Sequence, residues 1–215
     1  MTNPLSAYLA PLPLIAVLRG ITPEEIPAIA AVLVSGGFRV LEVPLNSPRP
    51  FESIRALAAA VGDRCLVGAG TVLAAGDVAR VNAAGGRLIV MPHADVAIIR
   101  AAKEQRLVCV PGVATPTEAF AALAAGADGL KMFPADQLPP AALKAWRAVL
   151  PADALVFPVG GIKPETMALY WAAGASGFGT GSNLYRPGAS ADQVRAVAAA
   201  YAAAFRALPG GEGAA

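Results

Sequence analysis

The chain has 215 residues, enough for one well-buried domain and too few for two of ordinary size. Hydrophobic residues make up 56 % of it, but many are alanine, and no apolar run reaches the ~18 residues of a membrane-spanning helix. The net charge is +2 and the 17 basic residues are scattered, which argues against nucleic-acid binding. The first residues lack the basic start and apolar core of a secretion signal. We therefore expect a cytoplasmic protein with neither nucleic-acid nor membrane partners.

Few side chains of this sequence are suited to hold a metal ion. The chain has one histidine, His93, and two cysteines, Cys65 and Cys109, each of which lies inside an apolar run. No cluster of His and Cys has the spacing of a zinc site. We expect two reduced cysteines in the core, no metal site and no cofactor.

Eight short apolar runs, typical of buried strands, alternate with longer alanine-rich amphipathic stretches, typical of helices. The strand-like runs are 14–19, 39–45, 65–71, 87–92, 108–114, 129–135, 154–161 and 177–182. Their first residues lie 21 to 26 positions apart, which leaves room for one helix and two short loops in each interval. Strands that alternate with helices in this way predict a parallel sheet.

The signals for helix ends agree with this alternation. Thr22-Pro23-Glu24-Glu25 and Thr115-Pro116-Thr117-Glu118 each combine a cap residue, a first-turn proline and an acidic residue. Glycines recur where helices should end, as at Gly126 and Gly174. Eight such units predict an α/β protein with a (β/α)₈ TIM-barrel fold, formed as a single compact domain by residues 1–208.

An open, doubly wound sheet is the alternative fold. That fold usually carries G-x-G-x-x-G after its first strand, whereas this chain has Leu18-Arg19-Gly20-Ile21 there. The final segment, 209–215, lacks core-forming residues, and we expect it to be disordered.

Three charged residues lie inside or at the end of strand-like runs: Arg19, Glu42 and Lys131. A charge in a barrel strand is costly unless it is paired or used, and catalytic residues of such barrels lie where the strands end. A desolvated lysine loses its proton more easily and becomes a nucleophile for a carbonyl carbon, while a nearby carboxylate transfers protons. The alternative is a buried Lys131–Glu42 ion pair without a catalytic role. The lysine and the carboxylate together favour imine chemistry.

Glycines follow the seventh and eighth strand-like runs. The sequence Val159-Gly160-Gly161 ends the seventh run, and Gly177-Phe178-Gly179-Thr180-Gly181-Ser182 forms the eighth. TIM barrels often bind phosphate in the loops after these two strands, because bare backbone N–H groups can approach the anion. The alternative is that the glycines only allow tight packing in a small barrel.

From about Pro13 to Leu208 the chain resembles the bacterial aldolases that cleave 2-keto-3-deoxy-6-phosphogluconate and its galactonate epimer to pyruvate and glyceraldehyde 3-phosphate. The segments that carry the resemblance are Ile15-Ala16-Val17-Leu18-Arg19-Gly20-Ile21-Thr22-Pro23, Glu42-Val43-Pro44-Leu45-Asn46-Ser47-Pro48, Gly68-Ala69-Gly70-Thr71-Val72, Leu130-Lys131-Met132-Phe133-Pro134, Val159-Gly160-Gly161 and Gly181-Ser182-Asn183-Leu184-Tyr185.

This resemblance implies a role for each matching residue. Lys131 is expected to carry the Schiff base of a class I aldolase, and Glu42 to transfer protons. Arg19 and Thr71 are expected to contact the substrate, including the pyruvate carboxylate. The remaining expected site residues are, for the phosphate, Gly161, Gly181 and Ser182, and, for the pocket wall, Pro92 and Phe133. The family also implies a homotrimer.

Two positions favour the galactonate branch of this family. Gluconate-type members usually have an arginine four residues after the catalytic glutamate and a threonine before the glycine pair, whereas this chain has Asn46 and Val159. The loss of one hydroxyl beside a sugar carbon changes epimer preference by about 1 kcal/mol. The expected substrate is therefore 2-dehydro-3-deoxy-6-phosphogalactonate, with the gluconate epimer as the alternative.

Two other functions remain open from the residues alone. A different phosphate-binding barrel enzyme, such as an isomerase or epimerase, would explain the glycines and Glu42 but not a nucleophilic Lys131. A non-catalytic sugar-phosphate-binding protein would keep the phosphate loops without needing either residue.

Overall fold

The computed structural model describes residues 3–10 and 12–211. Its strands are β1 (Leu14–Val17), β2 (Val40–Pro44), β3 (Leu66–Gly70), β4 (Leu88–Val90), β5 (Val108–Val110), β6 (Gly112–Val113), β7 (Leu130–Met132), β8 (Val156–Pro158) and β9 (Phe178–Thr180). Its helices are α1 (Ser6–Leu9), α2 (Ile26–Ser35), α3 (Pro50–Val61), α4 (Ala75–Ala83), α5 (Val96–Glu104), α6 (Pro116–Ala124), α7 (Pro140–Arg147), α8 (Pro164–Ala172) and α9 (Ala191–Arg206). No helix within the described ranges is long and apolar enough to cross a membrane.

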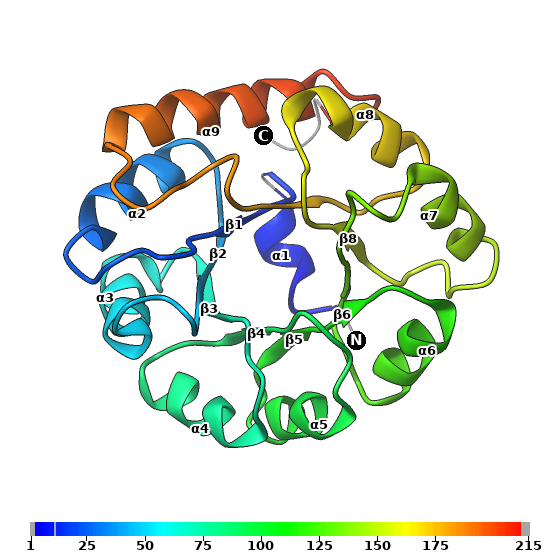
Figure 1. The fold of residues 1–215 in the computed structure, drawn as a ribbon, viewed down its shortest axis with the longest axis horizontal. Coiled ribbons are helices and arrows are strands. Elements are labelled where there is room, and N and C mark those ends of the chain that lie inside the picture. The colour runs from blue at the N-terminus through cyan, green and yellow to red at the C-terminus, as the bar shows by residue number, and fades with distance from the viewer. Residues whose placement is uncertain (1–2, 11, 212–215) are drawn as a thin grey trace.

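All strand pairs are parallel, as the alternation of strands and helices predicts. One sheet has the order β5-β4-β3-β2-β1-β9, and a second has the order β6-β7-β8. Figure 1 shows the strands as a ring with α2 to α9 around it. The last strand pairs with the first, an arrangement that an open doubly wound sheet does not have. The fold is therefore a parallel α/β fold, and its arrangement in two sheets is consistent with a TIM-barrel-like architecture.

The segment 108–114, which we expected to form one strand, is divided at Pro111 into β5 and β6. Proline has no N–H to donate to a ladder, so pairing is interrupted at this position. β5 pairs with β4, whereas β6 pairs with β7, and the Pro111 carbonyl accepts a hydrogen bond from the Lys131 N–H at 2.8 Å. The chain thus passes from one sheet to the other without a helix in between.

Successive strand residues point alternately to two separate cores. In β2, Leu41 and Val43 belong to the large core between the strands and the surrounding helices, whereas Val40 belongs to a smaller core inside the ring. This period of two places Glu42 on the inner side with Val40. Leu5 and Leu9, before and at the end of α1, complete the inner core.

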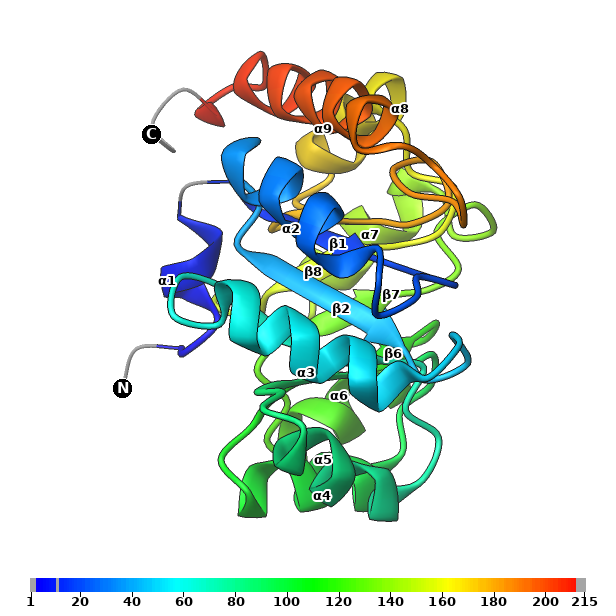
Figure 2. The ribbon, with the colours of Figure 1, turned by 90° about the vertical axis from the view of Figure 1, so that its left-hand side faces the viewer.

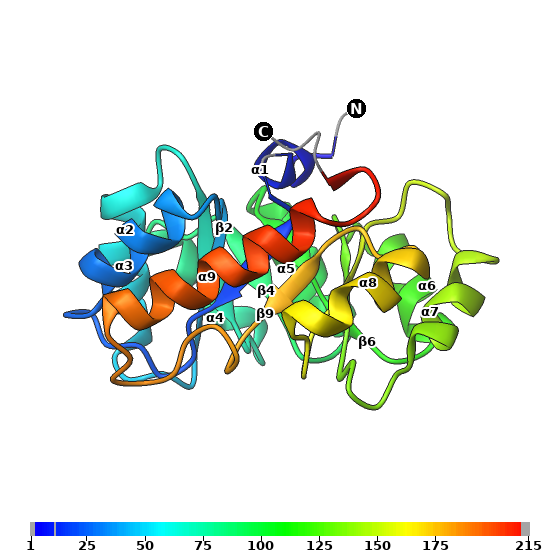
Figure 3. The same ribbon diagram turned by 90° about the horizontal axis from the view of Figure 1, so that it is seen from above.

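Helix α1 lies on the side of the ring where the strands begin, and the loops that follow the strands lie on the opposite side (Figures 2 and 3). The helix start predicted at Thr115 is confirmed, because its side chain and that of Glu118 form a capping box at the start of α6. The start predicted at Thr22-Pro23-Glu24-Glu25 is wrong in position: these residues form a turn, α2 begins at Ile26, and its first turn holds no acidic residue. The Glu25 carboxylate instead accepts a hydrogen bond from the Thr22 N–H within that turn. Of the segment 209–215, expected to be disordered, residues 209–211 form a turn whose Pro209 carbonyl accepts a hydrogen bond from Trp171. Residues 212–215 lie outside the described residues.

Candidate active site

A cavity of about 240 Å³ opens where the strands end. It is smaller than the roughly 300–1,000 Å³ of drug-sized sites, so it suits a compact metabolite. Its lining consists of Val17, Arg19, Lys131, Phe133, Val159, Gly160, Gly161, Ile162, Gly179, Gly181, Ser182 and Asn183. A second cavity of about 10 Å³, barely enough for one water molecule, is lined by Lys131 and Glu42 among apolar side chains.

Lys131 lies in the middle of β7 and is 5 % exposed. Its Nζ lies 4.6 Å from the centre of the Phe133 ring, and no direct ion pair joins it to Glu42 among the described residues. Burial lowers the pKa of this amine, the Glu42 carboxylate partly opposes that change, and Arg19 adds to it. Lys131 therefore releases its proton more readily than an exposed lysine, which is the condition for nucleophilic attack.

Glu42 lies on the inner side of β2 and is 1 % exposed. A Cβ at Gly70 would overlap its carboxyl group, so this glycine of β3 makes the space that the side chain fills. Oε2 has no hydrogen-bond partner among the described residues. Burial raises the pKa of Glu42 to about 7, although the positive charges of Lys131 and Arg19 oppose the increase. The group can thus both donate and accept a proton near neutral pH.

Arg19 follows β1 at the rim of the larger cavity. Its guanidinium donates a hydrogen bond to Asn46 Oδ1 at 2.7 Å and a longer one to Thr71 Oγ1 at 3.4 Å. Thr71 has a left-handed backbone (φ 53°), which is unusual for a β-branched residue. The loops after β1, β2 and β3 therefore bring one positive charge and two polar side chains together, an arrangement that suits a carboxylate.

The loops after β8 and β9 form another part of the wall of this cavity. Gly160 and Gly161 have φ values of 102° and 71°, a backbone conformation that side chains rarely adopt. A Cβ at Gly181 would meet no protein atom closer than 3.8 Å, so tight packing does not explain this glycine. Its surface faces the cavity instead, which leaves backbone N–H groups and Ser182 accessible to an anion.

The structure brings most of the sequence-predicted site residues together. Arg19, Lys131, Phe133 and the predicted phosphate residues line the larger cavity, and Glu42 lines the smaller one. Thr71 reaches the site through Arg19, while Pro92 is absent from both linings. Asn183, which the sequence did not single out, lines the cavity and donates a hydrogen bond to the Ile162 carbonyl at 3.1 Å. Its signal in the sequence is its place in Gly181-Ser182-Asn183-Leu184-Tyr185, one of the segments that carry the family resemblance.

Residues 5–199 match the model of a protein family described as KDPG and KHG aldolase. A probable 2-dehydro-3-deoxy-6-phosphogalactonate aldolase of Rhizobium meliloti (strain 1021) is 50 % identical over 93 % of this chain and 94 % of its own length. A 2-dehydro-3-deoxy-6-phosphogalactonate aldolase of Escherichia coli (strain K12) is 47 % identical over 91 % and 95 % of the two chains.

Two solved structures extend the comparison to the fold. A structure described as native KDPGal is 47 % identical, with a TM-score of 0.89 over 91 % of this chain and 95 % of its own. A KDPG aldolase from Legionella pneumophila, with pyruvate captured as a covalent carbinolamine intermediate, is 28 % identical. Its TM-score is 0.79 over 94 % of this chain and 98 % of its own.

The raised pKa of Glu42 predicts a pH dependence of stability. The folded protein binds the Glu42 proton more tightly than the unfolded chain does, because the pKa of this carboxyl group is 4.5 in the unfolded chain and about 7 in the folded protein. The contribution of this proton to the free energy of unfolding is therefore complete below pH 4.5 and is lost as pH rises through 7. The free energy of unfolding of the wild type minus that of Glu42→Gln should fall by about 2 kcal/mol from pH 5 to pH 8. Urea denaturation of both proteins at both pH values measures this difference in the free energy of unfolding.

The matched control is Glu104→Gln, which alters an exposed carboxyl group on α5 and should show no such change between the two pH values. A wild-type-minus-Glu42→Gln difference that stays constant or grows with pH would contradict the assigned direction.

Proposed function

Because the chain belongs to the KDPG and KHG aldolase family, and is therefore a carbon–carbon lyase, we propose that it reversibly cleaves 2-dehydro-3-deoxy-6-phosphogalactonate to pyruvate and D-glyceraldehyde 3-phosphate. The observation that carries the proposal is the buried pair of Lys131 and Glu42, which share a cavity without forming an ion pair. The galactonate aldolases among the relatives support the choice of substrate.

In the proposed reaction, the neutral amine of Lys131 attacks the C2 carbonyl carbon of the substrate. The carbinolamine loses water to give an iminium ion, which accepts the electron pair released when the C3–C4 bond breaks. The Legionella relative with its captured carbinolamine supports this covalent route. The lowered pKa of Lys131 supports it too, because only the unprotonated amine is nucleophilic.

Glu42 is the proton carrier in this proposal. Removal of the C4 hydroxyl proton releases the aldehyde and leaves an enamine on Lys131. Return of a proton to C3 then gives the iminium of pyruvate, which water hydrolyses. A carboxyl group with a pKa of about 7 is suited to both transfers, because neither its acid nor its base form is scarce near neutrality.

The cavity offers groups that suit both charged ends of the substrate. We assign the pyruvate carboxylate to Arg19 and Thr71, since the guanidinium is the cation at the rim that can pair with it. We assign the phosphate to the loops after β8 and β9, through Gly161, Gly181 and Ser182.

We also propose that the two sheets form one closed (β/α)₈ barrel. The bridge between Val159 and Gly179 links the end of β8 to β9, and residue Pro111 alone separates β5 from β6. The expected homotrimer remains a proposal. It is supported by a related designed cage, 47 % identical and built by fusing symmetric oligomeric domains.

Replacement of Lys131 by alanine tests the proposed function. The variant should release pyruvate from 2-dehydro-3-deoxy-6-phosphogalactonate at least about 10³-fold more slowly, because no other group in the cavity can form the imine. Pyruvate release is followed with a lactate dehydrogenase coupled assay. Lys144→Ala, which alters an exposed lysine on α7, serves as control and should keep full activity. Turnover that survives in Lys131→Ala would refute the imine route, and a wild type without turnover would favour a binding protein or isomerase.

Val159 provides a test of epimer choice, since its side chain lines the cavity beside Gly160. The wild type should prefer the galactonate epimer. Val159→Thr should shift the ratio of kcat/KM values toward the gluconate epimer by about fivefold, because the added hydroxyl supplies roughly 1 kcal/mol of hydrogen bonding. Steady-state kinetics on both epimers measure the ratio.

Val43→Thr, the same change at a buried position that faces the helices, controls for the cost of burying a hydroxyl group. If Val159→Thr leaves the ratio of kcat/KM values for the two epimers unchanged, or if Val43→Thr shifts that ratio equally, the residue at position 159 does not determine epimer choice.

A further inference from the structure

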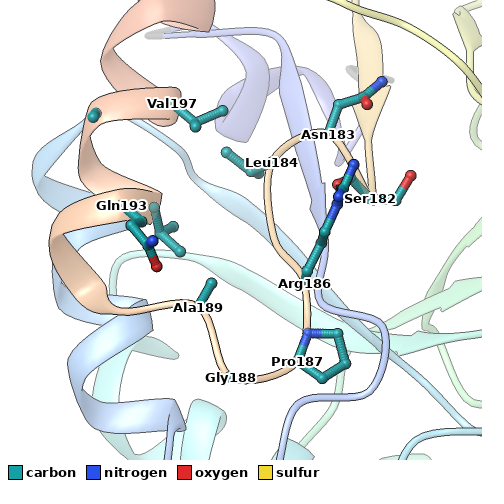
Figure 4. A pocket seen from close by; sticks show the side chains of 11 residues that line it. Ser182, Asn183, Leu184, Arg186, Pro187, Gly188, Ala189, Gln193 and Val197 are labelled. Atoms are coloured by element: carbon teal, nitrogen blue, oxygen red, sulfur yellow. Dashed lines mark hydrogen bonds between the residues drawn. The ribbon is translucent and has the colours of Figure 1, made fainter.

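The turn at 181–186, assigned above to the phosphate, has open space on two sides. Ser182 and Asn183 line the catalytic cavity and also a groove of about 670 Å³ between this turn and α9. Figure 4 shows Leu184 directed toward α9 while Ser182 and Asn183 project elsewhere. Leu184 is buried in the large core, whereas Ser182 and Asn183 border open space on two sides, so the position of these two residues depends also on the hydrogen bonds that hold the ends of the turn.

One such group is Tyr185, which is 2 % exposed. Its N–H donates a hydrogen bond to the Gly181 carbonyl at 3.0 Å and so closes the turn. Its hydroxyl donates to Glu25 Oε1 at 3.0 Å, across 160 positions of the sequence. The Gly188 N–H donates to the same oxygen at 3.3 Å, so Glu25 holds the chain on the C-terminal side of the turn at two points.

Glu25 also holds the loop after β1, which carries Arg19. Its second oxygen, Oε2, accepts a hydrogen bond from the Thr22 N–H at 2.8 Å. Burial alone would raise the pKa of Glu25, but the hydrogen bonds from Thr22, Tyr185 and Gly188 outweigh burial and lower it. An ionised carboxylate has two accepting oxygens, whereas a glutamine side chain has one. Only the carboxylate can therefore accept from both loops at once.

The two loops also touch directly. Gly20 has a φ of 82°, and a Cβ at this position would lie 2.6 Å from Cγ of Pro187, which follows the turn. The approach is close enough that a displacement of one loop is transmitted to the other. The two loops follow the paired strands β1 and β9, and each supplies a residue to the cavity lining: Arg19 lies in one, and Ser182 in the other.

We propose that Glu25 and Tyr185 are positioning residues, which fix the phosphate turn relative to the Arg19 loop and so set affinity for the phosphorylated end of the substrate. This inference rests on the proposed function, since it takes the turn as the phosphate site. Neither residue touches the substrate. They act only by setting how far the backbone N–H groups of the turn lie from the substrate phosphate and how these groups are oriented toward it.

The test is Tyr185→Phe in the full chain, which removes the hydroxyl and keeps the buried ring. The condensation of pyruvate is measured with D-glyceraldehyde 3-phosphate and with unphosphorylated D-glyceraldehyde. KM for the phosphorylated aldehyde should rise between about threefold and tenfold, since the energy of a hydrogen bond to a charged group sets the scale and only part of it is transmitted to phosphate binding. KM for pyruvate and the kinetic constants for D-glyceraldehyde should change less than about twofold, because neither compound has a phosphate group to bind the turn. A merely destabilised protein would instead lose both activities alike.

Tyr170→Phe is the matched control, because its buried hydroxyl donates to the carbonyls of Ala135 and Leu138 and does not bond to the turn. It should leave the ratio of the two aldehydes unchanged. Glu25→Gln is the second variant and should raise the same KM at least twofold, which tests the pair even if Tyr185→Phe does not fold.

Three outcomes would overturn the inference. The first is an unchanged KM for the phosphorylated aldehyde, and the second is an equal rise for both aldehydes. In both cases active wild-type enzyme would leave the proposed function intact. The third is a wild type that condenses neither aldehyde, which would refute the proposed function and the inference together.

Discussion

The arrangement of this site depends on the burial of two ionisable side chains that do not form a direct ion pair. Burial removes the charged forms of Lys131 and Glu42 from water, which is unfavourable, and the attraction between the two charges offsets only part of this cost. Burial drives both toward their neutral forms. Burial, to which Arg19 adds in the case of Lys131, thereby gives the lysine and the carboxyl the properties that the proposed nucleophile and proton carrier need. A direct ion pair would favour the charged forms and weaken both properties.

The parallel strands place these groups and make room for them. The period of two along β2 and β7 directs both side chains inward, where Gly70 leaves space for the Glu42 carboxyl. Apolar side chains fill the rest of the ring, from Leu5 on one side to Val159 on the other, and keep the dielectric constant low around the pair. The polar groups of the site come from the loops after the strands, which supply a cation after β1 and glycine backbone after β8 and β9.

Much of this site follows from the sequence because its signals are local. A lysine and a glutamate inside apolar strand-like runs are unusual, and glycine pairs after late strands are recognisable in position. The interruption at Pro111 could have been anticipated, since proline cannot donate to a ladder. The role of Glu25 could not. Its place in Thr22-Pro23-Glu24-Glu25 predicted only a residue in the first turn of a helix, whereas α2 begins at Ile26. Nothing local indicates that one carboxylate oxygen bonds to Tyr185, 160 positions away. Long-range contacts of this kind emerge only when the ring brings the first and last loops together.

The imine mechanism requires that Lys131, rather than another amine, forms the covalent bond to pyruvate. The chain has three other lysines, Lys103, Lys144 and Lys163, which serve as internal references. The most direct measurement is incubation with pyruvate and sodium borohydride at neutral pH, followed by peptide mapping by mass spectrometry. If the imine forms on Lys131, one reduced pyruvyl adduct per chain is expected, located on Lys131 alone. A folded protein without an adduct, or with adducts spread over the other lysines, would contradict it.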